Sequence, residues 1–230
     1  MDGARTACAL WYASRGRAEL RPAPLLPPGF GEARVRTLWS ALSRGTERLV
    51  FEGRISMFEN ERMRAPMQDG DFPFPVKYGY SAVGMVEEGP DDLAGRTVFA
   101  LHPHQDGFVA PADCLVPIPE AVPSRRAALA ANMETALNAL WDSGAGPGDR
   151  IVIVGSGVVG LLVGYLAARL PGADVTMVDI DPSRSAVASD WGCAFQKPLD
   201  AVDEADVVFH SSATAPGLVC ALACAGTEAT

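Results

Sequence analysis

The stretch IVIVGSGVVGLL, residues 151–162, restricts the possible folds more than any other part of the chain. Its β-branched apolar residues predict a buried strand, and Gly155, Gly157 and Gly160 then form the pattern G-x-G-x-x-G where a helix should begin. In such a turn the first glycine permits a tight bend, the second lets a pyrophosphate approach the backbone, and the third lets helix pack on strand. The stretch therefore predicts a strand-helix-strand unit with a dinucleotide site.

A carboxylate follows at the distance that this fingerprint requires. Asp179 stands 22 residues after Gly157, at the expected end of the second strand, where it would accept hydrogen bonds from ribose hydroxyls. Because a carboxylate repels a 2'-phosphate, NAD is favoured over NADP, and Arg184 alone argues the other way. The predicted cofactor-binding residues are Gly155, Ser156, Gly157, Val158, Val159, Gly160, Asp179 and Arg184.

Two alternatives to a dinucleotide site stay open. The glycine turn can be a purely structural connection between strand and helix that binds nothing. Methyltransferases that bind S-adenosylmethionine also combine a glycine turn with an acidic residue at the end of the second strand, although a preceding β domain argues against them.

The 230 residues exceed the usual size of one domain, and their pattern changes near residue 123. Residues 1–122 contain short alternating segments bounded by Pro and Gly, typical of a mostly antiparallel β domain. Residues 123–230 begin with a helix, with Ser124 as its N-cap and Gly144 as its stop. Strands at 151–154, 174–180 and 205–212 then alternate with helices, which predicts a parallel sheet. A doubly wound domain usually has six strands, so we expect this one to be incomplete at its C-terminus.

Composition excludes several classes of partner. The formal net charge is -9, and no cluster of Lys and Arg suggests binding to nucleic acid or to an anionic membrane surface. The N-terminus has no apolar signal segment, and the five cysteines include no C-x-x-C pair. We therefore expect a cytoplasmic protein that acts on a small molecule.

The order of β domain, helix and glycine fingerprint resembles the medium-chain dehydrogenase/reductase superfamily, the relatives of zinc alcohol dehydrogenases. The segments SRGTERLVFEGR and GYSAVGMVEEGP are most similar to the branch that contains bacteriochlorophyllide hydroxyethyl dehydrogenase. The resemblance implies a fold of class α/β: a GroES-like, mostly antiparallel β domain followed by an incomplete Rossmann doubly wound parallel sheet. It also implies a nicotinamide held between the domains, a homodimer as a possible assembly, and a further C-terminal portion.

The resemblance also locates the metal positions of the zinc members, and here they carry other residues. Arg44 stands at the Cys ligand, Tyr80 at the His ligand and Ala131 at the third ligand. The four cysteines of the structural zinc lobe are missing as well, because residues 97–106 contain no Cys. Tetrahedral catalytic zinc needs three protein ligands, so we predict no metal.

Side chains would then have to handle the proton and the charge on the substrate oxygen. Thr46 keeps the hydroxyl position that begins a proton relay in zinc relatives, and Tyr80 could donate a hydrogen bond to a carbonyl. His104, two residues after His102, is a candidate proton shuttle. The alternatives are that Tyr80 fills the vacated metal cavity, that Thr46 caps a turn, and that the histidines only pack.

These residues predict a zinc-independent oxidoreductase that transfers a hydride between NAD(H) and a secondary alcohol or ketone. Two other functions stay open. One is an NADPH-dependent quinone or enoyl reductase, and the other is a truncated, inactive remnant that binds nucleotide.

Overall fold

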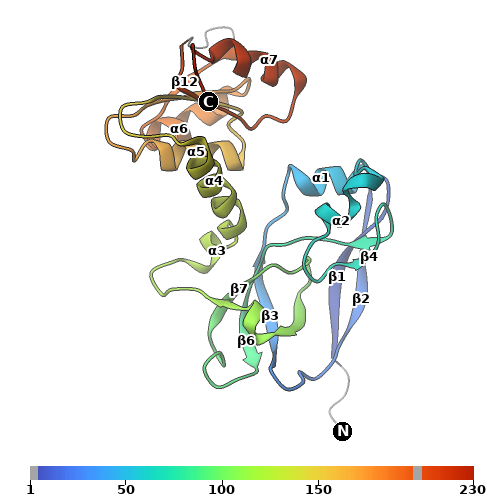
Figure 1. The fold of residues 1–230 in the computed structure, drawn as a ribbon. Coiled ribbons are helices and arrows are strands. Elements are labelled where there is room, and N and C mark those ends of the chain that lie inside the picture. The colour runs from blue at the N-terminus through green and yellow to red at the C-terminus, as the bar shows by residue number, and fades with distance from the viewer. Residues whose placement is uncertain (1–4, 199–203) are drawn as a thin grey trace. The chain divides into compact units, whose positions relative to one another are not determined.

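The structure is a computed structural model that describes residues 5–198 and 204–230. The chain forms two compact units, Met1–Ala131 and Asn132–Thr230. The first runs from blue to green in Figure 1 and the second from yellow-green to red. The units divide at the second residue of a helix, whereas the predicted domain boundary at 122/123 precedes that helix.

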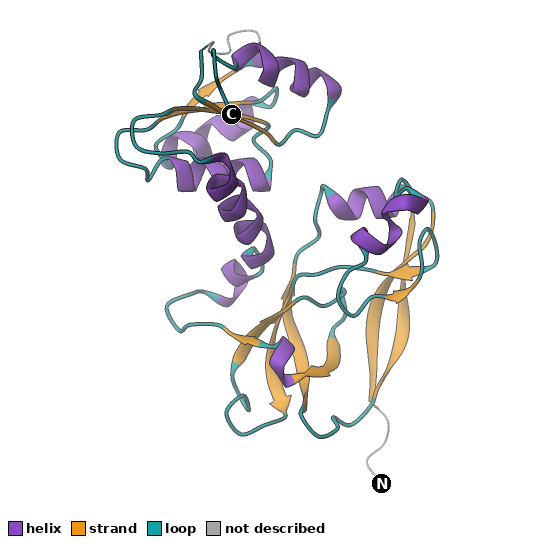
Figure 2. Ribbon diagram, in the orientation of Figure 1, coloured by secondary structure: helices purple, strands orange, loops and turns teal. Residues whose placement is uncertain are grey.

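The first unit consists mainly of β-strands (Figure 2). Its described strands are β1 (Arg5–Ser14), β2 (Arg17–Leu25), β3 (Glu32–Ser40), β4 (Asp69–Gly70), β5 (Val76–Lys77), β6 (Ala82–Glu88), β7 (Thr97–Ala100), β8 (Gly107–Pro111) and β9 (Val116–Pro117). Its short helices are α1 (Thr46–Phe51), α2 (Asn60–Met63) and α3 (Ser124–Ala127), with 3-10 turns η1 (Met57–Glu59) and η2 (Ala112–Cys114). The strands form sheets of order β2-β1-β5-β4 and β8-β3-β6-β7-β9, and all of these pairings are antiparallel. The mostly antiparallel β domain is therefore confirmed.

The strand β3 lies inside the larger sheet, between β8 and β6, and its side chains alternate between buried and outward-facing. Ala33 and Val35 are fully buried, while Arg34 and Arg36 between and after them reach carboxylates on the other side. Such alternation is what a strand with one core-facing side requires. Residues of β6, β7 and β8 complete this core, including Val86, Val98 and Phe108.

The strand β2 contains prolines, which the sequence pattern treats as boundaries of strands. Pro22 and Pro24 lie inside β2, paired with Cys8 and Thr6 of β1. Proline cannot donate to a sheet ladder, so it is tolerated on an edge strand, where one side is free. β2 is such an edge, because β1 is its neighbour in the sheet order and no described strand pairs beyond it.

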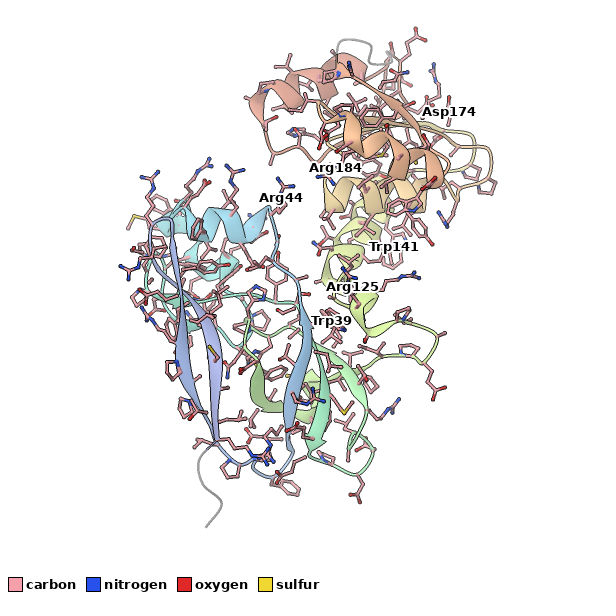
Figure 3. All side chains as sticks on the ribbon, turned by 180° about the vertical axis from the view of Figure 1, so that it is seen from behind. Trp39, Arg44, Arg125, Trp141, Asp174 and Arg184 are labelled. Carbon is pink, nitrogen blue, oxygen red and sulfur yellow. The ribbon has the colours of Figure 1, made fainter. Side chains whose placement is uncertain are left out.

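The single helix expected from Ser124 to Gly144 is wrong in two respects. The structure has two helices, α3 and α4 (Ala130–Ser143), and Pro123 rather than Ser124 is the N-cap. The Ser124 hydroxyl instead accepts a hydrogen bond from Trp39 Nε1 at 3.2 Å, and Arg125 lies over the Trp39 ring (Figure 3). Between the helices, the Ser81 hydroxyl donates to the Ala128 carbonyl at 2.5 Å.

The hydrogen bond from Ser81 engages the Ala128 carbonyl, which in one continuous helix would lie in the helix interior. This bond therefore accounts for the break between α3 and α4. The predicted stop is confirmed, because Gly144 follows α4 with φ of +69°.

The second unit alternates strands and helices along the chain. After α4 its described elements are β10 (Arg150–Val154), α5 (Val158–Ala167), β11 (Asp174–Val178), η3 (Pro182–Arg184), α6 (Ser185–Asp190), β12 (Ala194–Gln196), β13 (Val207–His210) and α7 (Ala215–Cys224). The strands pair in parallel in the order β12-β11-β10-β13. Counted along the chain from β10, this order is 3-2-1-4, the first part of the doubly wound order 3-2-1-4-5-6.

Helices cover both faces of this parallel sheet, as Figure 2 shows. Ile151 and Ile153 of β10 pack with α4, α5 and α6 on one face. Val152 and Val154 pack with Ala221 and Cys224 of α7 on the other. The short edge strand β12 was not predicted, because three residues are too few to show a period. No helix among the described residues is long and apolar enough to cross a membrane.

We predict that two glycines of the turn respond differently to replacement by alanine. A Cβ on Gly160 would lie 1.9 Å from the Gly155 carbonyl oxygen, so Gly160→Ala should lower the free energy of unfolding by about 3 kcal/mol or more. A Cβ on Gly157 meets no atom within 4 Å, and its φ of -71° suits any residue, so Gly157→Ala should change stability by less than about 0.5 kcal/mol. Urea unfolding of both variants measures the difference, and equal losses would contradict this account of the turn.

Candidate functional site

The glycine turn of the second unit connects the end of β10 to the start of α5. Gly155 has φ of +107°, and a Cβ there would lie 2.5 Å from the Ser212 backbone nitrogen. Gly155 and Gly160 are therefore required by the fold itself. Gly157 is exposed and has open space beside it, so packing within the described chain gives no reason for a glycine at this position.

Ser156 carries a buried hydroxyl in the middle of this turn. Its side chain is 1% exposed, and its Oγ has no hydrogen-bond partner among the described residues. Its backbone N–H donates to Asp179 Oδ2 at 2.5 Å. The two valines that follow differ: Val158 is 45% exposed, whereas Val159 packs against the core of the unit.

Asp179 follows directly after β11, and its carboxylate holds two backbone segments together. Besides the bond from Ser156, its Oδ1 accepts a hydrogen bond from the Asp181 backbone nitrogen at 2.8 Å. The side chain is half-buried and therefore remains accessible at the edge of the turn. Arg184, labelled in Figure 3, pairs with Asp181 at 3.4 Å. Arg184, the residue that argues for NADP, thus pairs with a carboxylate.

Hydroxyl groups after β13 complete this end of the sheet. The Ser211 hydroxyl donates to the Gly155 carbonyl at 2.6 Å, and Ser212 Oγ lies 3.1 Å from Thr214 Oγ1. In open parallel sheets, ligands bind at the carboxyl ends of the strands where the strand order reverses, which here is between β10 and β13. Sequence reasoning missed these serines, although the run HSSAT at the end of a predicted strand is a visible signal.

The first unit carries the three predicted catalytic residues. Thr46 is the first residue of α1 and is half-buried. Tyr80 is half-buried, with its ring edge-on to Tyr78 at 6.2 Å between centroids. His104 is 7% exposed and lies in the loop between β7 and β8. The His102 ring, two residues away, stacks on Phe108 at 3.8 Å.

Glu47, to which the sequence pattern gave no role, is a buried residue of α1. Its carboxylate joins α1 to the loop that contains His104. Glu47 is 3% exposed, and its Oε2 lies 2.6 Å from His104 Nε2 and 2.8 Å from the Tyr12 hydroxyl that donates to it. Burial, followed by the negative charge of Glu47, raises the pKa of Tyr12, so Tyr12 stays a donor. The other ring nitrogen of His104, Nδ1, is hydrogen-bonded to Ser40 Oγ.

The donor set at the superfamily's metal positions does not fit zinc. Arg44 is an exposed cation that precedes α1 (Figure 3), and Tyr80 offers only a phenol. Among the side chains that the structure describes, no group of three or more His, Cys, Asp and Glu could hold a metal ion. Because zinc sites in proteins need three such ligands, we derive no chemical step through a metal.

Comparison with known proteins gives matches among curated proteins and among solved structures. No model of a known protein family matches the chain. Among curated proteins, sorbitol dehydrogenase 2 of Saccharomyces cerevisiae is 31% identical over 111 residues, which are 46% of this chain and 31% of that enzyme. The chain thus matches about a third of the length of this relative.

Solved structures match the chain over most of its length. Acetophenone reductase from Geotrichum candidum NBRC 4597, in complex with NAD, has a TM-score of 0.77 at 18% identity and covers 97% of this chain and 74% of that one. A structure from Sinorhizobium meliloti 1021, assigned as a zinc-binding dehydrogenase and bound to NADP, has a TM-score of 0.80 at 18% identity and covers 98% and 75%.

These matches confirm the resemblance that the sequence suggested. The chain has the GroES-like and Rossmann folds of these solved dehydrogenase and reductase structures, and 46% of it is similar in sequence to sorbitol dehydrogenase 2. The branch around bacteriochlorophyllide hydroxyethyl dehydrogenase stays a prediction. So do the individual site residues, because the relatives differ from this chain in sequence and bind either NAD or NADP.

We predict that protonation of His102 is coupled to folding. Burial lowers the pKa of His102 to about 4, whereas the unfolded chain binds this proton below about pH 6.5. The stability linked to this group is therefore present above about pH 6.5 and is lost as the pH falls toward about 4. Between about pH 7 and about pH 5 the loss amounts to about 2 kcal/mol.

Urea unfolding at both pH values measures this effect. The variant His102→Phe keeps a ring on Phe108 but cannot titrate, so it should lose about 2 kcal/mol less than the wild type over this range. An equal loss in both proteins would contradict the assignment.

Proposed function

We propose that this chain is a zinc-independent oxidoreductase that transfers a hydride between NAD(H) and a secondary alcohol or ketone. The observation that carries the proposal is Gly157. Packing of the described residues gives no reason for a glycine there. The open space lies at the N-terminus of α5, beside the buried Ser156 hydroxyl, which has no hydrogen-bond partner among those residues. A nucleotide phosphate would account for both features.

In this proposal the turn binds the cofactor through its backbone. The first N–H groups of a helix have no partner within the helix, and the helix dipole favours negative charge at this end. Val158, Val159 and Gly160 supply these groups at the start of α5, and Asp179 would accept hydrogen bonds from the adenosine ribose. The bound nicotinamide supplies hydride transfer.

The side chains of the first unit would manage the substrate oxygen. During reduction of a ketone, negative charge develops on this oxygen, and a positioned donor stabilises it. Tyr80 would donate such a hydrogen bond from its phenol, and Thr46 would do so from its hydroxyl. His104 has both ring nitrogens engaged, so we give it no role in proton transfer.

NAD is preferred over NADP in this proposal because of charge. The Asp179 carboxylate would lie against a 2'-phosphate and repel it, and Arg184 is paired with Asp181. An NADPH-dependent quinone or enoyl reductase is the second candidate, since one similar structure contains NADP. The relative affinity for the two cofactors separates these candidates.

We expect Asp179→Asn to weaken NADH binding by roughly tenfold and to reduce the preference over NADPH, because the variant loses the charged acceptor but keeps an amide oxygen for the Ser156 N–H. Asp174→Asn is the matched control, since Asp174 is exposed at the opposite end of the same strand (Figure 3). Fluorescence titration of NADH and NADPH measures both. If the two variants behave alike, Asp179 has no role in cofactor choice.

We expect Tyr80→Phe to lower kcat/KM for ketone reduction by about 100-fold while NADH affinity stays unchanged, because the variant removes a single hydrogen-bond donor. Activity would be assayed with NADH and a panel of aliphatic and aromatic ketones. Tyr78→Phe is the control, because the Tyr78 hydroxyl donates to the Met63 carbonyl at 2.9 Å and has a structural partner. Full activity in Tyr80→Phe would remove Tyr80 from the mechanism.

A further inference from the structure

We propose that Glu47 and His104 form a buried ion pair, and that this pair positions the backbone next to Thr46 and next to Tyr80. His104 is then a positioning residue rather than a proton shuttle. This inference rests on the proposed function for its catalytic consequence. The pair itself follows from the hydrogen bonds of the first unit alone.

The partners of Glu47 require a carboxylate. Its Oε1 accepts the Ser43 backbone N–H at 2.8 Å, and its Oε2 accepts the Tyr12 hydroxyl and lies next to His104 Nε2. A backbone N–H can only donate, and Tyr12 stays protonated because burial raises its pKa. Donors therefore reach both oxygens of this side chain, which is 3% exposed.

The partners of His104 suit a proton on each ring nitrogen. The Ser40 hydroxyl donates its only proton to the Ser81 backbone carbonyl at 2.8 Å, so it can only accept from His104 Nδ1. At the other nitrogen, the Glu47 carboxylate accepts from Nε2 at 2.6 Å. An imidazole with two N–H donors is an imidazolium, and its positive charge balances Glu47 in the core.

This pair ties together segments that are far apart in the sequence. The loop with His104 is fixed independently, since the Leu10 N–H donates to the His104 carbonyl and Thr37 Oγ1 donates to the Gln105 carbonyl. The backbone of this loop is therefore held in place without the ion pair. The His104 ring connects the loop to Glu47, and so to the first turn of α1.

The His104 ring also fixes the backbone that immediately precedes Tyr80. Gly79 has φ of +138°, and a Cβ on it would lie 2.7 Å from His104 Nε2. The His104 ring thus packs directly on the Gly79 backbone. Thr46 immediately precedes Glu47, and Tyr80 immediately follows Gly79. One ion pair therefore contacts the neighbours of both proposed substrate-binding residues, and loss of either charge would leave the other buried without an opposite charge.

The test uses Glu47→Gln, His104→Gln and the double variant, with Glu52→Gln as the control. Glu52 is the C-cap of α1 and pairs with Arg48 and Arg54 at the surface, so the control makes the same chemical change next to the same helix. The rate of trypsin cleavage after the exposed Arg44 reports the order of the loop between Ser40 and Thr46. NMR of the ring nitrogens of His104, assigned with the His104→Gln variant, reports their protons.

We expect NMR to show a proton on both ring nitrogens of His104 in the folded wild type. Each single variant should be cleaved after Arg44 about tenfold faster or more, and the double variant should be closer to the wild type than either single one, because it restores charge balance. The singles should lower kcat by roughly 100-fold with NADH affinity unchanged, since misplaced groups lose rate rather than cofactor binding. The control should match the wild type in every assay.

Two results would overturn the inference: a neutral His104 with one ring proton, or single variants that are cleaved and turn over like the wild type. If the wild type has no dehydrogenase activity, the proposed function fails. In that case the NMR and cleavage results still decide whether the ion pair exists and orders the loop.

Discussion

The contact between Gly160 and the carbonyl oxygen of Gly155 is the constraint on which the second unit depends. A single added carbon would lie 1.9 Å from that oxygen, so α5 can approach β10 this closely only without a side chain at position 160. The Ser211 hydroxyl donates to the same oxygen at 2.6 Å and so connects the end of β13 to the same point. The start of α5 and the ends of β10 and β13 therefore meet at this carbonyl group.

This constraint leaves one part of the turn without a structural explanation. Gly155 and Gly160 are explained by their neighbours, whereas Gly157 faces open space and Ser156 beside it buries a hydroxyl with no partner among the described residues. A bound ligand would account for these two features, which the packing of the described residues does not require. The first unit shows the opposite arrangement, because its polar groups Glu47 and His104 are buried and fully bonded to each other and to their neighbours.

Local patterns in the sequence were enough to predict much of this structure. The apolar run, the glycine spacing and Asp179 predicted the order β10, α5 and β11, because each of these signals acts within a few residues. The sequence pattern failed to predict local structure where a contact between residues far apart in the sequence determines it. The break between α3 and α4 depends on the Ser81 hydroxyl, and β2 tolerates two prolines only because it is an edge strand. Glu47 carries no local signal of its contacts, since its partner His104 lies 57 positions away.

The most direct test of the central claim is a fluorescence titration of the 230-residue chain with NADH and, separately, with NADPH. The account predicts saturable binding of NADH and clearly weaker binding of NADPH, because the turn accepts a pyrophosphate and Asp179 repels a 2'-phosphate. A folded chain that binds neither cofactor would contradict the claim that the open space at Gly157 is a nucleotide site.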